Sequence, residues 1–450
     1  MRRPTLLPLL LVLVALAAGA CAESDLRLSV DERGTGPSRT SDRPSGDPDD
    51  VVAVALGDLE EYWGDTLDEV YDVEFEPLQG GYVPYGPGTA LPRCGTEPLT
   101  YDMIAENALY CPAEDLIAWD RVALVPDLQA RFGALTVGLV MAHEFSHAIQ
   151  NRAGLTAATV TLELQADCFA GAWVDDVDDR IDLFATDGDA LDQAVAGLLE
   201  LRDSLGVSGR DPMAHGSGFD RVGAFQDGFE NGAEACTSYI EDPPSVVAIP
   251  FGSAKDQITG GNMALGELLP LLQKDLESFF TALLAEQGRT WDAVDGFEAF
   301  DPTDGPIRCG RAEVAGDELE LASFFCASDD TAYMDGAELI PELEAIGDFA
   351  FGGELARLYA FAAQEQLDLD AGDEVREGLH ADCTTGVYTA AQFLGQIPDQ
   401  ELQLSPGDVD EIIIAFLAFG GDSEASAFER TAAFRAGFVR GFEACEPILD

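Results

Sequence analysis

The feature that most constrains the fold of this chain is a segment that occurs twice, once near the middle and once at the C-terminal end. Residues 219–236 align without gaps to residues 428–445, and ten of these eighteen positions are identical. Self-similarity at a long, fixed period is typical of a duplicated structural unit. We therefore expect two copies of a unit of roughly 190 residues, which is an ordinary domain size.

Shorter matches extend the repeat toward the N-terminal side of each copy. The matched pairs are 94–95 with 309–310, Cys111 with Cys326, 166–168 with 381–383, and 58–60 with 275–277. We predict a first domain over 51–240, a linker over 241–262 that contains Pro243 and Pro244, and a second domain over 263–450.

The N-terminal residues are typical of an exported protein. Two arginines precede an apolar run that ends in small residues, so 1–20 is predicted to be a signal peptide. Residues 18–21 resemble a lipobox, which would place a lipid on Cys21 and anchor the protein to the outer face of the cytoplasmic membrane. Residues 21–50 would then be a disordered tether. Cleavage after Ala20 and plain secretion is the alternative.

The cysteines agree with export. Nine cysteines are present, and lipidation of Cys21 leaves eight, an even number suited to disulfides. If both copies pair internally in the same way, three patterns are possible. The simplest pattern joins Cys94 to Cys111, Cys168 to Cys236, Cys309 to Cys326 and Cys383 to Cys445.

The first copy contains a motif with a specific chemistry, the pentapeptide of residues 143–147. His143 and His147 are four residues apart, so on a helix they share a face and can bind one Zn²⁺. Glu144 stands beside them as a candidate general base. Two histidines on a half-buried helix that binds no metal are the alternative.

A third ligand is available shortly afterwards. Glu163 and Asp167 are also four residues apart, so one carboxylate can complete the zinc site and the other can orient His143 through its free N–H. An acidic solvated helix face is the alternative for this pair.

The second copy lacks this chemistry. Aligning 351–357 with the histidine motif places Gly353 at His143 and Arg357 at His147, and Gly378 stands where Glu163 stood. These residues cannot bind zinc, so the second domain is predicted to be a degenerate, zinc-free repeat. His380 is then a structural or surface histidine.

The ordered set of motifs in the first copy resembles the bacterial neutral zinc metallopeptidase family. The residues that carry the resemblance are His143, Glu144, His147, Gln150, the run 163–173 and His215 with 216–217, with 110–113 upstream. The resemblance implies a zincin-like fold, one zinc on His143, His147 and Glu163, and Glu144 as the catalytic base. It covers about residues 90–236.

His215 is a further catalytic candidate, because a loop histidine can stabilise an oxyanion. The alignment pairs it with Glu424, so it is lost together with the zinc ligands, whereas Arg221 has the counterpart Arg430. A helix-capping or surface histidine is the alternative for His215.

The hydrophobic periodicity predicts an α+β fold dominated by helices. The repeat and the family resemblance together imply two zincin-like units that each hold a small sheet. The predicted helices are 51–71, 133–153, 159–180, 187–204, 219–236, 263–286, 338–366, 384–395, 408–419 and 427–444. Strands are expected near 82–84, 107–124 and 318–326. The apolar stretch 109–119 is either an edge strand beside the site, or an ordinary core strand or a loop closed by a Cys94–Cys111 bridge.

The sequence therefore predicts a zinc peptidase that hydrolyses a peptide or protein substrate with a metal-activated water and Glu144 as general base. The alternative is a lipid-anchored peptide- or partner-binding module with a vestigial or structural zinc. A formal net charge of −60 excludes a nucleic-acid-binding protein. Contact with a membrane is expected only through the lipid.

Overall fold

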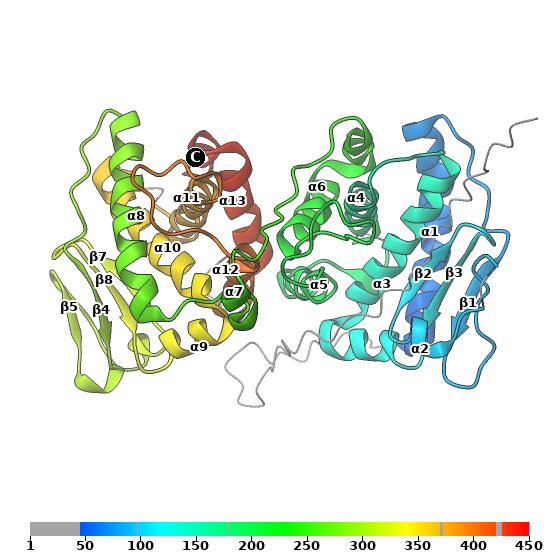
Figure 1. Ribbon diagram of the computed structural model, residues 1–450, viewed down its shortest axis with the longest axis horizontal. Coiled ribbons are helices and arrows are strands. Elements are labelled where there is room, and N and C mark those ends of the chain that lie inside the picture. The colour runs from blue at the N-terminus through cyan, green and yellow to red at the C-terminus, as the bar shows by residue number, and fades with distance from the viewer. Residues whose placement is uncertain (1–45, 97, 179, 370–371, 420–424, 450) are drawn as a thin grey trace, which may run out of the picture.

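The computed structural model describes residues 46–449 except 97, 179, 370–371 and 420–424 (Figure 1). The predicted signal peptide, the lipidation site Cys21 and most of the tether lie outside the described residues. Within the described part of the chain, no helix combines the length and the apolar character needed to cross a membrane.

The N-terminal half places a three-stranded sheet beside five long helices. Its elements are α1 (Pro48–Tyr71), β1 (Gly81–Tyr85), α2 (Tyr101–Ile104), β2 (Ala108–Cys111), β3 (Leu116–Asp120), α3 (Leu124–Arg152), α4 (Thr159–Asp178), α5 (Gly188–Glu200) and α6 (Gly218–Thr237). The strand order is β1-β3-β2, with β1 parallel and β2 antiparallel to β3.

The C-terminal half has a similar order of long helices and the same pairing in its three-stranded sheet, but it has the hairpin β5–β6 instead of α2 and two helices, α9 and α10, where the N-terminal half has α3. Its elements are α8 (Leu265–Glu286), β4 (Gly296–Phe300), β5 (Ile307–Cys309), β6 (Ala312–Val314), β7 (Ser323–Cys326), β8 (Thr331–Asp335), α9 (Leu339–Ile346), α10 (Asp348–Leu367), α11 (Glu374–Leu394), α12 (Asp408–Phe419) and α13 (Ala427–Arg440). The strand order is β4-β8-β7, with β4 parallel and β7 antiparallel to β8.

The prediction of a helix-dominated α+β fold is confirmed, but several bounds were wrong. The stretch 338–366 is two helices, which are separated by the extended backbone of Gly347, φ 164° and ψ 171°. A side chain cannot replace this glycine without a shift, since a Cβ there would lie 1.9 Å from the carboxyl carbon of Glu411. Helix α11 begins at Glu374, ten residues before the predicted 384. The hairpin β5–β6 and the strands β4 and β8 were not predicted.

The repeated segments form the last long helix of each half, and glycine explains their similarity. A Cβ at Gly228 of α6 would lie 1.7 Å from the carbonyl oxygen of Cys168 in α4, and a Cβ at Gly437 of α13 would lie 1.9 Å from that of Cys383 in α11. Only glycine allows the two backbones of each pair to approach so closely. The disulfide Cys168–Cys236 joins α4 to α6, and Cys383–Cys445 joins α11 to the segment that follows α13.

The four disulfides of the structure are those of the simplest pattern. Besides the two long-range bridges, Cys94 is bonded to Cys111 and Cys309 to Cys326, each pair 17 residues apart. Each bridge joins two cysteines of the same half, and each half contains two bridges.

Replacing Cys168 and Cys236 by alanine should destabilise the protein by about 4 kcal/mol, because the bridge closes a long loop of the unfolded chain. Thermal unfolding of the oxidised double variant measures the loss. The Cys94→Ala/Cys111→Ala variant, which opens a shorter loop, should lose only about 3 kcal/mol. An equal or larger loss in the short-loop variant would contradict this ranking.

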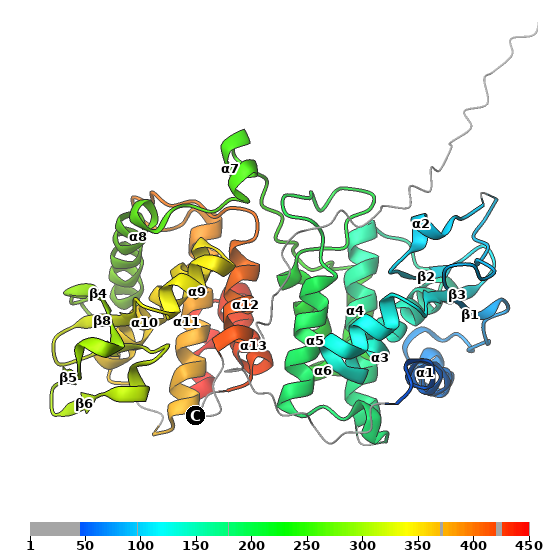
Figure 2. The same cartoon turned by 90° about the horizontal axis from the view of Figure 1, so that it is seen from below.

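The two halves pack through reciprocal contacts (Figure 1). Asp192 of α5 accepts hydrogen bonds from the first two backbone N–H groups of α13, those of Ala427 and Phe428. Asp410 of α12 accepts the equivalent bonds from Gly218 and Phe219 of α6. One hydrophobic core runs through both halves. Helix α7 (Ala254–Thr259), which has no buried residue, projects from the body between them (Figure 2).

Candidate metal centre

Helix α3 carries the histidine motif on its buried side. Gly133 adopts φ 80°, which interrupts the helical path, and the second segment runs on through His143 and His147. The two rings lie edge to face with centroids 4.8 Å apart. His143 is 9% exposed.

Helix α4 brings Glu163 to the same point. The two Nε2 atoms of His143 and His147 lie 3.2 Å apart, and Glu163 lies 3.2 Å from the first and 3.6 Å from the second. Ligands bonded to one tetrahedral zinc at about 2.0–2.1 Å are separated by about 3.3 Å. The three predicted ligands therefore have the spacing of a zinc site, and they form one of the groups able to hold a metal ion.

The hydrogen bonds of the imidazoles show that the three ligands present lone pairs to one another. His143 Nδ1 lies 2.8 Å from Asp167 Oδ1, and His147 Nδ1 lies 2.9 Å from Gln150 Oε1. The amide of Gln150 donates to Leu162 O at 2.7 Å, so its oxygen is the atom that faces His147. Both Nδ1 atoms therefore carry a proton, and both Nε2 atoms face Glu163, where each can give up its own proton and offer a lone pair to a metal. A cation satisfies this arrangement.

The sequence reasoning gave Gln150 no role, although it orients the second histidine. The signal for it is its spacing, three residues after His147, which places the amide one turn further along the same face of α3. Asp167, the predicted partner of His143, lies where it was expected.

Arg221 of α6 completes the network behind the metal ligands. Its guanidinium donates to both carboxylate oxygens of Asp167 at 2.9 and 2.8 Å, and both side chains are buried. Burial raises the pKa of Asp167, but Arg221 and His143 outweigh it and lower the pKa below its ordinary value. Asp167 is therefore an anion that holds His143 in one tautomer.

In the protein without metal, protons compete for the same histidines. Burial lowers the pKa of His143, but Asp167 and Glu163 outweigh it and raise the pKa to about 10. Burial likewise raises the pKa of Glu163, but the two histidines hold it well below its ordinary value. Binding of zinc must therefore release protons.

Glu144 lies next to the edge of the sheet. The backbone N–H of Tyr110 in β2 donates to Glu144 Oε2 at 2.7 Å. Strand β2 is at the edge of the sheet and β3 is central, so the expected edge strand within 109–119 is only its β2 portion. The candidate base thus lies between the metal ligands and an edge strand.

His215 is not brought into this cluster by any hydrogen bond among the residues that the structure describes. Its ring nitrogen Nδ1 lies 3.1 Å from Asp203 Oδ1, and its backbone N–H donates to the same carboxylate. The cap of α6 is Ser217, in a capping box with Asp220, so His215 does not cap that helix either. The catalytic assignment of His215 stays a prediction.

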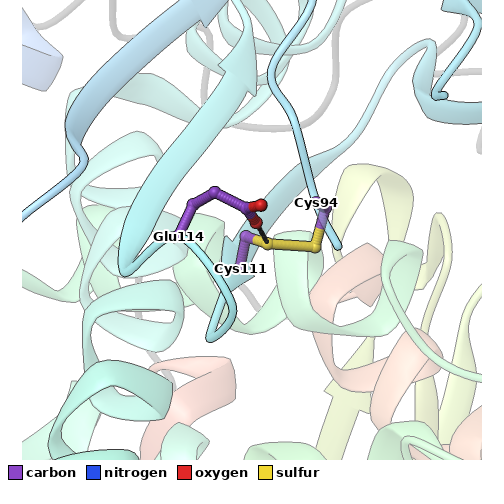
Figure 3. A group of neighbouring side chains, drawn as sticks. All are labelled: Cys94, Cys111 and Glu114. Carbon is purple, nitrogen blue, oxygen red and sulfur yellow. Dashed lines mark hydrogen bonds between the residues drawn. A yellow bond between two sulfur atoms is a disulfide. The ribbon is translucent and has the colours of Figure 1, made fainter. Parts of the chain in front are cut away.

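A second group of possible ligands is excluded by its bonding. Glu114 lies beside Cys111 in Figure 3, and Cys94 completes the group. Because the two sulfurs form a disulfide, neither is a thiolate that could bind a metal.

In the C-terminal half an arginine stands where the N-terminal half has a ligand. Arg357 Nε lies 2.9 Å from Asp382 Oδ1, and Arg430 also binds Asp382, as His143 and Arg221 bind Asp167. A Cβ at Gly378 would lie 3.2 Å from the guanidinium of Arg357, so the missing side chain leaves room for it.

These contacts correct the alignment of the two motif helices by one turn. Gln364 donates to Glu377 O and lies 2.8 Å from His380, as Gln150 donates to Leu162 O and to Gln165. Arg357 therefore corresponds to His143, not to His147. The sequence alignment missed this because it relied on Glu354, whose identity matched Glu144 by chance.

Comparison with known proteins agrees with the geometry. A protein-family model described as "Putative neutral zinc metallopeptidase" matches residues 5–239, which ends just beyond α6. Two curated proteins, each named "Uncharacterized protein YpfJ", come from Escherichia coli strain K12 and Escherichia coli O6:H1. Each is 25% identical over 211 residues, covering 42% of this chain and 70% of the relative. No solved structure matches the chain.

Proposed function

Because the chain belongs to the putative neutral zinc metallopeptidase family, we propose that its N-terminal half hydrolyses peptide bonds with zinc held by His143, His147 and Glu163. The observation that carries the proposal is the convergence of two imidazole lone pairs and one buried carboxylate at zinc-ligand spacing. When bound there, zinc would polarise the scissile carbonyl and lower the pKa of a water molecule toward neutrality.

The proton transfer, the orientation of the metal ligands and the binding of the peptide would each depend on particular residues of the chain. Glu144 accepts the proton of the attacking water and delivers it to the leaving amine. Asp167 keeps His143 in the tautomer that binds metal, and Arg221 keeps Asp167 ionised. An extended peptide would lie along the edge strand β2, where its backbone would compete with Glu144 for the N–H of Tyr110.

The C-terminal half would be a duplicated unit that has become a scaffold. The similar order of long helices, the common sheet pairing and the equivalent disulfides support one duplication with domains near 51–240 and 263–450. Arg357 places a fixed positive charge on Asp382, so this half would fold without metal. Its contact with the catalytic half runs through Asp410, which caps the helix that carries Arg221.

We also propose that the protein acts outside the cytoplasmic membrane, anchored by a lipid on Cys21. The four disulfides support an oxidising compartment, where such bridges persist.

Metal removal tests the proposed function. The purified protein should contain about one zinc per chain. It should cleave casein or a peptide library, lose this activity after treatment with a chelator and regain it with added zinc. Zinc content is measured by elemental analysis, and cleavage by mass spectrometry of the products. Zinc binding without chelator-sensitive cleavage would overturn the peptidase proposal and favour a peptide-binding module.

A further inference from the structure

Three carboxylates of the C-terminal half are buried together, far along the chain from the zinc ligands. Asp348 begins α10, and Asp408 and Glu411 lie in the first turn and a half of α12. Their exposed fractions are 9%, 3% and 6%. One oxygen from each lies within 4.8 Å of the others. No arginine, lysine or histidine of the described chain forms an ion pair with any of the three.

The hydrogen bonds of this carboxylate cluster (Asp348, Asp408 and Glu411) leave one acceptor without a partner. Oδ2 of Asp348 accepts from Met263 N at 2.8 Å, and Oε2 of Glu411 accepts from Phe349 N at 2.8 Å. Asp408 accepts from Ser405. Oδ1 of Asp348 is shielded from solvent and accepts no hydrogen bond. Buried polar atoms without a partner are rare, and a bound ion is one of the explanations for them.

The N-terminal half shows that the fold does not require these charges. In the N-terminal half, Gly133 lies against Gln193 of α5. In the C-terminal half, Gly347 lies in the same way against Glu411 of α12, so these residues occupy equivalent positions. Asp192 and Asp410, one residue earlier in each helix, make the reciprocal caps between the halves. By this register, the counterparts of the carboxylate cluster are the neutral residues Ala134, Ala190 and Gln193.

We propose that Asp348, Asp408 and Glu411 form a binding site for a hard divalent cation of the calcium type. Calcium takes oxygen ligands at about 2.3–2.6 Å, so two ligands of one ion lie at most roughly 5 Å apart, which the cluster satisfies. The side chain of Asn262 lies at the same place, since its Oδ1 accepts from Asp348 N at 3.4 Å. Zinc prefers nitrogen and sulfur ligands, so it does not fit an all-oxygen set.

The buried negative charge of the three carboxylates favours binding of a cation. Helix N-termini favour negative charge, but burial of three carboxylates costs more than two helix dipoles return. Asp410 adds a fourth negative charge nearby, and Arg202, at 3.1 Å, pairs with Asp410 rather than with the cluster. A divalent ion would neutralise most of this charge and would supply the missing partner of Asp348 Oδ1.

Without a cation, the negative charge of the cluster opposes its burial, because one oxygen of each carboxylate lies within 4.8 Å of the others. A divalent ion bound to the three carboxylates should stabilise the folded protein, so calcium should raise its stability at pH 8.

The test compares the full-length protein with a variant that carries the residues of the other half, Asp348→Ala/Asp408→Ala/Glu411→Gln. Because Ala134, Ala190 and Gln193 occupy the same positions in the N-terminal half, this variant should fold. After removal of metals, each protein is titrated at pH 8 with calcium and separately with magnesium, and binding is followed by calorimetry and by the thermal midpoint. The surface variant Glu344→Gln is the control for loss of a carboxylate.

Calcium at about 10 mM should raise the midpoint of the wild type and of Glu344→Gln by about 3 °C or more, and it should leave the triple variant unchanged. A larger response to magnesium would still support the divalent site and would reassign its ion. Equal responses of the wild type and the triple variant, or no response of either, would overturn the proposal. The readouts need no peptidase activity, so they stand whether or not the proposed function holds.

Discussion

The Glu144→Gln variant should keep its zinc and lose peptide hydrolysis by about 10²–10⁴-fold. Glutamine has the same shape as glutamate and can stay next to Tyr110 N, but it cannot accept the proton of the attacking water. His143, His147 and Glu163 are unchanged, so the metal content should remain that of the wild type. The measurement is kcat on a cleavable peptide together with zinc analysis of the same sample.

The control is Glu354→Gln, which removes the charge of a partly buried glutamate of the C-terminal half. Glu354 accepts from Ser323 and lies near Arg357, with no zinc ligand beside it. Its substitution should leave kcat unchanged. A wild-type rate in Glu144→Gln would show that another group is the base, whereas loss of zinc from that variant would show that Glu144 is needed for the site itself.

Replacing Arg221 by methionine should destabilise the protein by about 3–5 kcal/mol, because Asp167 is then a buried carboxylate without its guanidinium. The same change should weaken zinc binding by about 10–100-fold, since Asp167 no longer holds His143 firmly. Denaturant unfolding of the zinc-free protein gives the first quantity, and competition with a chromogenic chelator gives the second.

Arg430→Met separates these two effects. Arg430 binds Asp382 as Arg221 binds Asp167, but Asp382 lies in the half without zinc ligands. This variant should lose stability and keep the zinc affinity of the wild type. If both variants weaken zinc equally, the effect of Arg221 is a general loss of folding and not the positioning of His143.

The candidate metal ligands could be predicted from the sequence because their geometry is mostly local. Residues four apart on a helix share a face, so His143 with His147, and Glu163 with Asp167, follow from spacing alone. Only one contact between distant segments was needed for this prediction, the packing of α3 against α4. The resemblance to the family implied that contact.

The alignment of residues 351–357 with the histidine motif was wrong because the register of that helix depends on contacts between distant segments. Residue identity favoured Glu354 opposite Glu144, but the register of α10 depends on which residue reaches Asp382 across the core, and that residue is Arg357. The glycine at the break of this stretch, Gly347, lies in the same way against a distant residue, Glu411, more than sixty residues further on.

The sequence by itself therefore predicted most of the helices and the spacing of the candidate metal ligands, because each depends on neighbours along one helix. Only the tertiary structure decided which side chains meet across elements. It placed Gln150 on His147 and Asp410 on the first turn of α6, and it buried Asp348, Asp408 and Glu411 together. The physical reason is that burial and pairing of charges depend on packing between distant segments, which no local pattern records.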